Sequence, residues 1–383
     1  MHTHYKFFHL PHHKSQPLTV LTIAANLRSF LFAFFSLFLP IVIFQNYLYL
    51  GQQKALIVTL LFFVLLTLVY LLSTIPTTFL ASKFGLKFTF LLAQIFLLIF
   101  FLLLTKKMIF FAFITFGFAA SLWWYSYHLF FIEVSDKKQL GRQIGAVETV
   151  SVLSGVLAPF FGGLILESGG SSVFFLTGFI LTLASLSVIF FLTPPTKIVS
   201  VSLEENFHEM VKRKKDMIAF FGAGGEETIY TIAWPIILYL IFKNILTIAK
   251  ISTLIMLIAA LVYYISGLIV DKLNKDKLER IGVWAVFLSW IGKAFFQNPI
   301  ALTFFDTIHK VLGCFFVVPL TAIAYDHAKH EREKYIAFRE ISYRIGNLLA
   351  YASFFLILLC GLPLWTIFIS GAFFALLPLI IKA

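Results

Sequence analysis

The sequence predicts an all-α integral membrane protein in which twelve transmembrane helices form two pseudo-symmetric six-helix bundles. Of its 383 residues, 60% are hydrophobic and only 13% are charged, which leaves too little polar surface for a water-soluble domain of this size. Apolar runs of about 16 to 27 residues recur along the chain, and about 18 residues of helix cross a hydrocarbon core of ~30 Å. The runs lack the short alternating pattern of membrane β-barrel strands, so helices are expected throughout.

Short charged breaks separate the apolar runs and define the expected spans. The first half holds six runs, at residues 18–44, 55–80, 88–104, 108–131, 144–166 and 173–192. The second half holds six more, at residues 217–242, 251–270, 281–296, 300–324, 341–362 and 365–381. The first run is too long for a signal peptide and lacks a small-residue cleavage site, so we expect it to remain as a span. The chain then divides into a tail (1–17), a first bundle (18–193), a central loop (194–216) and a second bundle (217–383).

Lysine and arginine are distributed unevenly between the two sides of the predicted bundle. If the N-terminus is cytoplasmic, 22 of the 30 Lys and Arg residues lie in inner tails, loops and helix ends. Arg28 and Lys310 lie within spans, and the outer side holds Lys54, Lys106, Lys107, Lys243, Lys250 and Lys293. This positive-inside asymmetry predicts a multi-pass protein of the cell membrane with both termini cytoplasmic. It also accounts for the net charge of +12 without nucleic acid as a partner.

The central loop contains a helix signal of its own. Ser202 and Glu205 have the spacing of a capping box, and Leu203, Phe207, Met210 and Val211 then fall on one helical face. The basic run Lys212 to Lys215 follows. We expect a short amphipathic helix on the inner leaflet, with a plain solvated linker as the alternative.

The two halves resemble each other at three places. Pro40 in the first run parallels Pro235 in the seventh, the segment from Leu80 parallels that from Ile269, and Glu148 parallels Glu340. The offsets of 195, 189 and 192 residues are nearly constant. Parallel six-helix repeats are one of the known transporter architectures.

Two motifs identify a family. Residues 78–87 read TFLASKFGLK, which is similar to the pattern G-x-L-A-D-R-x-G-R-K between spans two and three, and residues 267–272 in the second half keep its Gly and Asp. Gly145, Pro159, Gly162 and Gly163 match the antiporter pattern G-x8-G-x3-G-P-x2-G-G, with Ser154 and Ala158 at two of its glycine positions. Over essentially its whole length, in a 6+6 arrangement, the chain resembles the major facilitator superfamily.

The resemblance implies alternating access around a cavity lined by spans one, four, seven and ten, with gating residues at the inner ends of helices. We expect Asp271 to meet Arg142, and Lys83 to meet Glu340, when the cavity faces outward, while Gly85 provides a tight turn. The predicted gating set is Lys83, Gly85, Arg142, Glu148, Asp271, Lys272, Arg339 and Glu340. The span-five motif favours efflux.

Ionisable residues lie deep in those same four spans, where each charge costs ~2.5–3.5 kcal/mol on insertion scales. Asp306, His309 and Lys310 share one helical face through their i,i+3 and i,i+4 spacing. A fixed ion-pair network between the halves is the structural alternative to a substrate or proton site. The predicted substrate and coupling residues are Arg28, Trp123, Trp124, Tyr127, His128, Glu226, Glu227, Asp306, His309 and Lys310.

The combined features predict a secondary active transporter that moves a small organic solute and is driven by protons. We expect a monomer in the lipid bilayer, with no cofactor, no metal and no enzymatic activity; the chain has no P-loop for ATP. Five histidines of the tail lack the paired spacing of a metal site. Two alternatives remain: a non-transporting sensor or scaffold on a transporter fold, and a membrane-embedded transferase, which the short, acid-poor outer loops disfavour.

Overall fold

The computed structural model describes residues 12–136, 140–193, 198–270 and 275–382. These residues form helices joined by short turns, with no strand among them, because a backbone in lipid must satisfy its hydrogen bonds within its own segment. Seven helical stretches in the described ranges are long and apolar enough to cross a membrane. Two of them, with 54 and 50 residues, are long enough to cross twice.

The first half of the chain folds into six spans. Its helices are α1 (His12–Phe35), α2 (Leu39–Tyr47), the 3-10 turn η1 (Leu48–Leu50), α3 (Gln52–Thr105), α4 (Ile109–Val134), α5 (Leu140–Gly155) and α6 (Ala158–Ile189). Gly85 and Gly170 take positive φ angles of 83° and 72° inside α3 and α6, a conformation that suits glycine. The chain reverses at both points, so each of these long helices supplies two antiparallel segments.

The second half repeats this path. Its elements are α8 (Lys214–Thr228), the π-helical turn η2 (Ile229–Ala233), α9 (Trp234–Phe242), α10 (Ile245–Val270), α11 (Lys275–Phe295), α12 (Pro299–Leu312), α13 (Cys314–His327), α14 (Arg332–Leu359), the turn η3 (Leu364–Thr366), α15 (Ile367–Leu376) and η4 (Leu377–Ile380). The all-α membrane fold predicted from the apolar runs is confirmed, and the path fits twelve spans.

Several spans are interrupted near their middle. The break between α1 and α2 precedes Pro40, the π-helical turn η2 precedes Pro235, and the break between α5 and α6 precedes Pro159. Proline cannot donate the i→i−4 hydrogen bond and its ring crowds the preceding turn. Pro40 and Pro235 each stand near the start of a short helix, so this pair of repeat positions has equivalent local structure.

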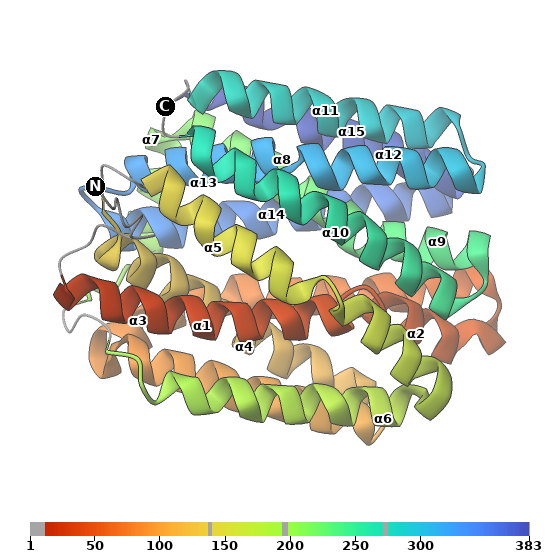
Figure 1. The fold of residues 1–383 in the computed structure, drawn as a ribbon, viewed down its shortest axis with the longest axis horizontal. Helices are drawn as coiled ribbons and strands as arrows, with labels where there is room; N and C mark the ends of the chain where they lie inside the picture. The colour runs from red at the N-terminus through yellow and green to blue at the C-terminus, as the bar shows by residue number, and fades with distance from the viewer. Residues whose placement is uncertain (1–11, 137–139, 194–197, 271–274, 383) are drawn as a thin grey trace, which may run out of the picture.

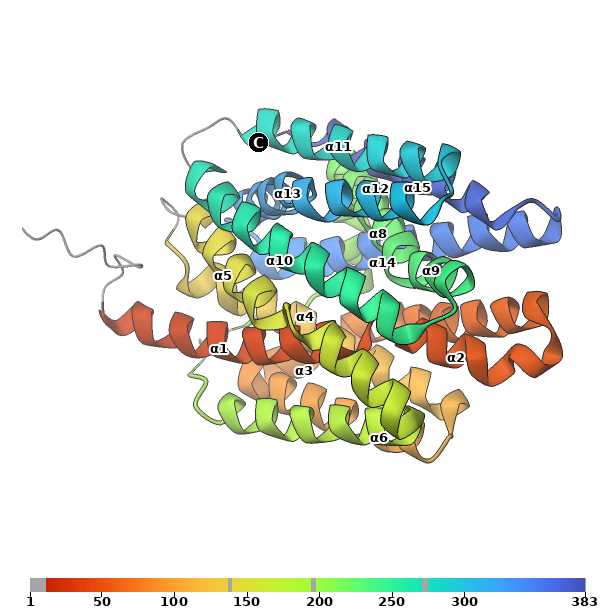
Figure 2. The ribbon, with the colours of Figure 1, turned by 45° about the vertical axis from the view of Figure 1, so that its right-hand side comes forward.

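The two halves lie side by side. Helices α5 and α10 run next to each other along their boundary (Figures 1 and 2), and α14 contacts α3. Helix α1 begins, and the last helix ends, at the same end of the bundle (Figure 1). We call this the termini end, and the opposite end, which holds the turn at Gly51, the far end.

Helix α7 (Leu203–Lys212) confirms the capping box in the central loop. The Ser202 hydroxyl accepts from the Glu205 N–H at 3.1 Å, and the Glu205 carboxylate accepts from the Ser202 N–H at 2.9 Å. Asn206 and Glu209 are buried against the protein, whereas Leu203 and Phe207 are about 70% exposed, at 71% and 67%. The apolar face therefore points outward, as contact with lipid would require; the position of α7 on the inner leaflet stays a prediction.

Candidate functional site

Two adjoining cavities lie between the halves. The first lobe has a volume of about 320 Å³ and the second lobe about 370 Å³. Their linings share five residues, Ser36, Glu227, Thr231, Val317 and Tyr343. Ser36 sits at the break between α1 and α2, and Thr231 in the π-helical turn η2. The cavities thus occupy the level at which the helices are interrupted, where transporter sites are commonly found.

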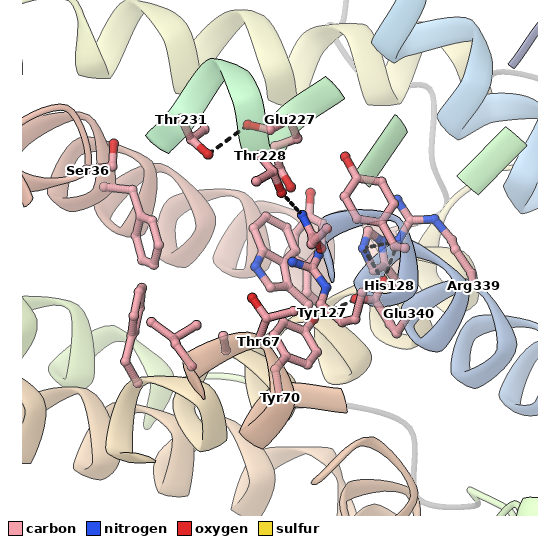
Figure 3. Close-up of a pocket in the computed structure, with 18 of the residues that line it drawn as sticks. Ser36, Thr67, Tyr70, Tyr127, His128, Glu227, Thr228, Thr231, Arg339 and Glu340 are labelled. Carbon is pink, nitrogen blue, oxygen red and sulfur yellow. Dashed lines mark hydrogen bonds and ion pairs between the residues drawn. The ribbon is translucent and has the colours of Figure 1, made fainter. Parts of the chain in front are cut away.

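The first lobe is apolar on one side and charged on the other. Phe32, Phe35, Phe63, Leu66 and Phe116 line it from the first half. Apart from His128 and Glu148, its ionisable acidic and basic side chains come from the second half and include Glu227, Arg339, Glu340 and Arg344. Figure 3 shows Ser36 at one end of the lobe and the His128, Arg339 and Glu340 group at the other, with Glu227 and Tyr70 on opposite walls.

A buried polar network closes the charged end of the first lobe. The Tyr70 hydroxyl donates to Glu340 Oε2 at 2.5 Å, and Arg339 pairs with the other oxygen of Glu340. Arg339 Nη1 also donates to His128 Nε2 at 2.9 Å, and His128 Nδ1 lies 2.5 Å from the Tyr325 hydroxyl. Because Tyr70 and His128 belong to α3 and α4, and Tyr325, Arg339 and Glu340 to α13 and α14, the network joins the two halves.

The second lobe contains an acid–imidazole pair. Glu226 Oε1 lies 3.2 Å from His309 Nε2 and accepts a 3.0 Å hydrogen bond from the Trp290 indole. His309 Nδ1 contacts the Ser289 hydroxyl at 3.0 Å, and the ring of Tyr230 stacks on the imidazole at a centroid distance of 4.4 Å. The geometry fixes the His309 ring, so one proton can be held between the carboxylate and the imidazole.

An ion pair lies beside this acid–imidazole pair. Lys293 Nζ is 2.8 Å from Asp306 Oδ1, and the lysine side chain is completely buried. Its ammonium also lies over the rings of Trp234 and Trp290, at 4.0 and 4.5 Å from their centroids. Pairing and cation–π contacts together offset the cost of a charge that has left water.

Four other charged groups line the cavities without an ion pair. Glu148, Glu227, Lys310 and Arg344 have no oppositely charged partner within 4.0 Å among the described residues. Glu227 faces both lobes, Glu148 and Arg344 face the first, and Lys310 faces the second. Such charges are costly in a low-dielectric site, and a bound solute or proton would compensate them.

The match to known families decides the identity. The family model of the Major Facilitator Superfamily matches residues 21–218, just over half of the chain. The chain belongs to the major facilitator superfamily. Members of this family are transporters, which supports the assignment of this protein as a secondary transporter. No curated protein matches the sequence at a significant level.

Solved transporters share the fold at low sequence identity. The human organic anion transporter TETRAN is 12% identical with a TM-score of 0.74, and the match covers 97% of this chain and 99% of that one. The E. coli fucose:proton symporter FucP is 12% identical with a TM-score of 0.70, and the match covers 95% of this chain and 97% of that one. The proton:xylose symporter XylE bound to 6-bromo-6-deoxy-D-glucose is 12% identical with a TM-score of 0.72, and the match covers 96% of this chain and 95% of that one. At this identity the similarity establishes the fold alone.

Most of the predicted substrate and coupling residues line the two lobes of the transporter. Those in the first lobe are Trp124, Tyr127, His128 and Glu227, and those in the second are Glu226, Glu227, Asp306, His309 and Lys310. Arg28 and Trp123 lie behind the wall: the guanidinium is 4.4 Å from the Trp123 ring centroid and 4.5 Å from that of Phe32. Glu226 contacts His309.

The predicted gating residues are more scattered. Gly85 makes the expected turn, but Glu340 pairs with Arg339 and Tyr70 instead of Lys83, whose ammonium lies 5.3 Å from the Phe84 ring centroid. Glu148 and Arg339 line the first lobe, and Arg142 lies in α5. Asp271 and Lys272 fall outside the described residues.

Three important residues were not expected from the sequence. The sequence places Lys293 at the outer end of a span, but its side chain is completely buried. Tyr70 and Arg344 line the first lobe from spans two and eleven, outside the four spans on which the family resemblance focuses. Arg344 lies four residues after Glu340 on α14, so helical spacing from that residue was the one available signal.

Proposed function

We propose that this transporter moves a small organic solute by alternating access, coupled to protons and with a slight preference for efflux. The solute occupies the two lobes between the halves. We also propose that it works in the cell membrane as a monomer, with both termini cytoplasmic, as the Lys and Arg asymmetry indicates.

The position of Glu227 is the observation that carries proton coupling. This carboxylate belongs to the wall of both lobes and has no cationic partner within ion-pair distance among the described residues. A proton can neutralise such a carboxylate, and the affinity for that proton depends on the distance to nearby cations. Movement of one half against the other would change this distance and so load or release the proton.

The acid–imidazole pair of Glu226 and His309 provides a second proton-holding group. It lies in the second lobe, next to Asp306 and Lys293. A solute that competes with the proton for these groups would give antiport. Antiport agrees with the efflux preference that Pro159, Gly162 and Gly163 suggest.

Flux from proteoliposomes tests this function. Vesicles loaded with a mixture of amphipathic and zwitterionic metabolites are diluted into buffers with and without a pH gradient, and the released solutes are measured by mass spectrometry. We expect at least one solute to leave faster from protein-containing vesicles, and a protonophore to remove the effect of the gradient. Release no faster than from protein-free vesicles would favour a sensor or scaffold, and release that ignores the gradient would contradict proton coupling.

A further inference from the structure

The unpaired charges of the first lobe define its ligand. We infer that the transported solute is a zwitterion with an apolar body, whose carboxylate binds Arg344 and whose ammonium group binds Glu227. This inference rests on the proposed transport function and adds the chemical class of the solute to it.

Arg344 is the anion-binding pole. Its guanidinium lies over two rings, 4.4 Å from the centroid of Tyr70 and 4.8 Å from that of Tyr343. These contacts orient the guanidinium but neutralise none of its charge, and its buried Nε has no hydrogen-bond partner among the described residues. Arginine presents a planar fork of donors that matches a carboxylate. Because the rings contact the face of the guanidinium, its in-plane N–H groups are the ones that can bind an anion in the cavity.

Glu227 and Asn347 form the cation-binding pole. The Asn347 amide nitrogen donates to Gly224 O at 2.9 Å and to the Thr228 hydroxyl at 2.5 Å, which fixes the side chain. Its buried Oδ1 accepts from no donor among the described residues, and both Asn347 and Glu227 line the first lobe. A carboxylate and an orphaned amide oxygen are acceptors, and an ammonium group brings three donors.

The two poles disfavour binding of a solute of a single charge sign. Glu227 and Glu340 are the carboxylates whose charges act on Arg344, so an anion bound there without a cation of its own would meet their repulsion. A cation at Glu227 would meet Arg344 and Arg339 in the same way. A solute that carries both charges neutralises both poles at once.

The rest of the lobe accommodates an apolar body. Phe32, Phe35, Phe63 and Phe116 line the lobe from the first half of the chain. Figure 3 shows the hydroxyl of Ser36 at the end of the lobe away from His128, Arg339 and Glu340. A volume of about 320 Å³ is within the range of small-molecule sites. An aromatic amino acid or a short apolar peptide has this combination of size, charge and apolar surface.

Binding of a matched ligand set to the protein in lipid nanodiscs tests the inference at one pH and without a gradient. The probes are L-phenylalanine and L-phenylalanyl-L-phenylalanine as zwitterions, N-acetyl-L-phenylalanine as the anion, and L-phenylalanine amide as the cation. Ligand-induced shifts in thermal unfolding give apparent affinities. We expect a zwitterion to bind about ten-fold or more tightly than either singly charged analogue, as the loss of a charge-assisted hydrogen bond predicts.

Protein variants assign each pole. Arg344→Gln should weaken the zwitterion and the N-acetyl anion but not the amide, which binds more tightly once the repulsion from Arg344 is removed, and Arg344→Lys should weaken the first two less. Glu227→Gln should weaken the zwitterion and the amide but not the N-acetyl anion, which binds more tightly once the repulsion from Glu227 is removed. Lys106→Gln, at an exposed turn of the far end, is the control and should change nothing.

Three results would overturn the inference: no shift with any probe on folded protein, equal binding of a singly charged analogue, or variants that weaken all probes alike. The outcome is separable from the proposed function. Charge-dependent binding with no gradient-dependent flux would refute proton coupling alone, and gradient-dependent flux of solutes that lack one of the two charges would refute this inference alone.

Discussion

Tyr70 and Glu340 connect the two halves of the transporter through a hydrogen bond of 2.5 Å between the phenol oxygen and Oε2 of the carboxylate. The ion pair between Arg332 and Glu133 also crosses between the halves, near the termini end. Towards the far end, the contact between Phe44 and Tyr239 is aromatic, with a centroid distance of 6.3 Å. A 3.3 Å hydrogen bond from Gln53 Nε2 to Leu358 O also joins the halves at the far end. The contacts between the halves that involve charged side chains of the described residues lie towards the termini end, so changes to charged groups and their partners should act mainly there.

Tyr70→Phe should favour opening of the termini end. The change removes one hydrogen bond to a buried carboxylate, worth about 1.5–3 kcal/mol, which corresponds to about a ten-fold shift or more between closed and open states. Spin labels on exposed Lys83 and Arg280 report the separation of the halves. Tyr125→Phe is a matched control, because the buried hydroxyl of Tyr125 has no partner. An unchanged distance distribution in Tyr70→Phe would contradict a closing role for this bond.

The ion pair of Lys293 and Asp306 should be important for stability. Lys293→Met leaves the Asp306 carboxylate buried without its cation, and removal of one partner from a buried pair costs about 3–5 kcal/mol. Lys293→Met combined with Asp306→Leu should recover a large part of this loss. Unfolding curves in detergent measure the free energy of unfolding of these variants, with Lys106→Met as the exposed control. A single variant as stable as the control would show that the pair contributes nothing.

The burial of Lys293 cannot be predicted from its position in the sequence. Glu226, Asp306 and His309 stand in the middle of apolar runs, where a charge is costly and therefore indicates a functional site. Lys293 stands near the end of its run, where a lysine ordinarily extends to the membrane interface. Its burial results from the packing of α11 against α12 and α15, which no local pattern encodes.

The same reasoning applies to Arg344. It lies close to Arg339 in the polar first part of α14, so composition groups it with interfacial charges. Its orientation toward the cavity depends on where α14 contacts α3 and α8. The lengths of the apolar runs are sufficient to predict the fold. Which charged side chains form ion pairs and which remain unpaired depends on contacts between helices that are far apart in the chain.

Arg28→Leu should leave the stability unchanged or raise it by about 1–3 kcal/mol. All three guanidinium nitrogens are buried and lack hydrogen-bond partners in the part of the chain that the structure describes, and an apolar residue of similar volume avoids this desolvation cost. Arg339→Leu is the contrasting variant, because it removes a partner from both Glu340 and His128 and should destabilise the protein. Thermal unfolding of the two variants gives the comparison. Equal destabilisation by the two variants would mean that Arg28 also makes stabilising contacts and would contradict this prediction.

The orientation in the membrane can be tested by cysteine labelling. Gln52 lies at the far end and Lys214 follows α7, and both are exposed. In a background that carries Cys360→Ser, because Cys360 is exposed, an impermeant maleimide added outside intact cells should label Gln52→Cys but not Lys214→Cys. The reverse pattern would invert the proposed topology.

Separate replacement of Glu226 and Glu227 by Gln is the most direct test of proton coupling. Stability and gradient-dependent efflux are measured on both variants. Glu227→Gln should fold normally and lose the dependence of efflux on the pH gradient. Glu227 has no ion-pair partner among the described residues to lose, and the glutamine can no longer bind a proton. Glu226→Gln should lose stability as well, since it weakens the contacts with His309 and Trp290. If both variants fold normally and their efflux responds to the pH gradient as the wild type does, proton coupling at these two carboxylates is wrong.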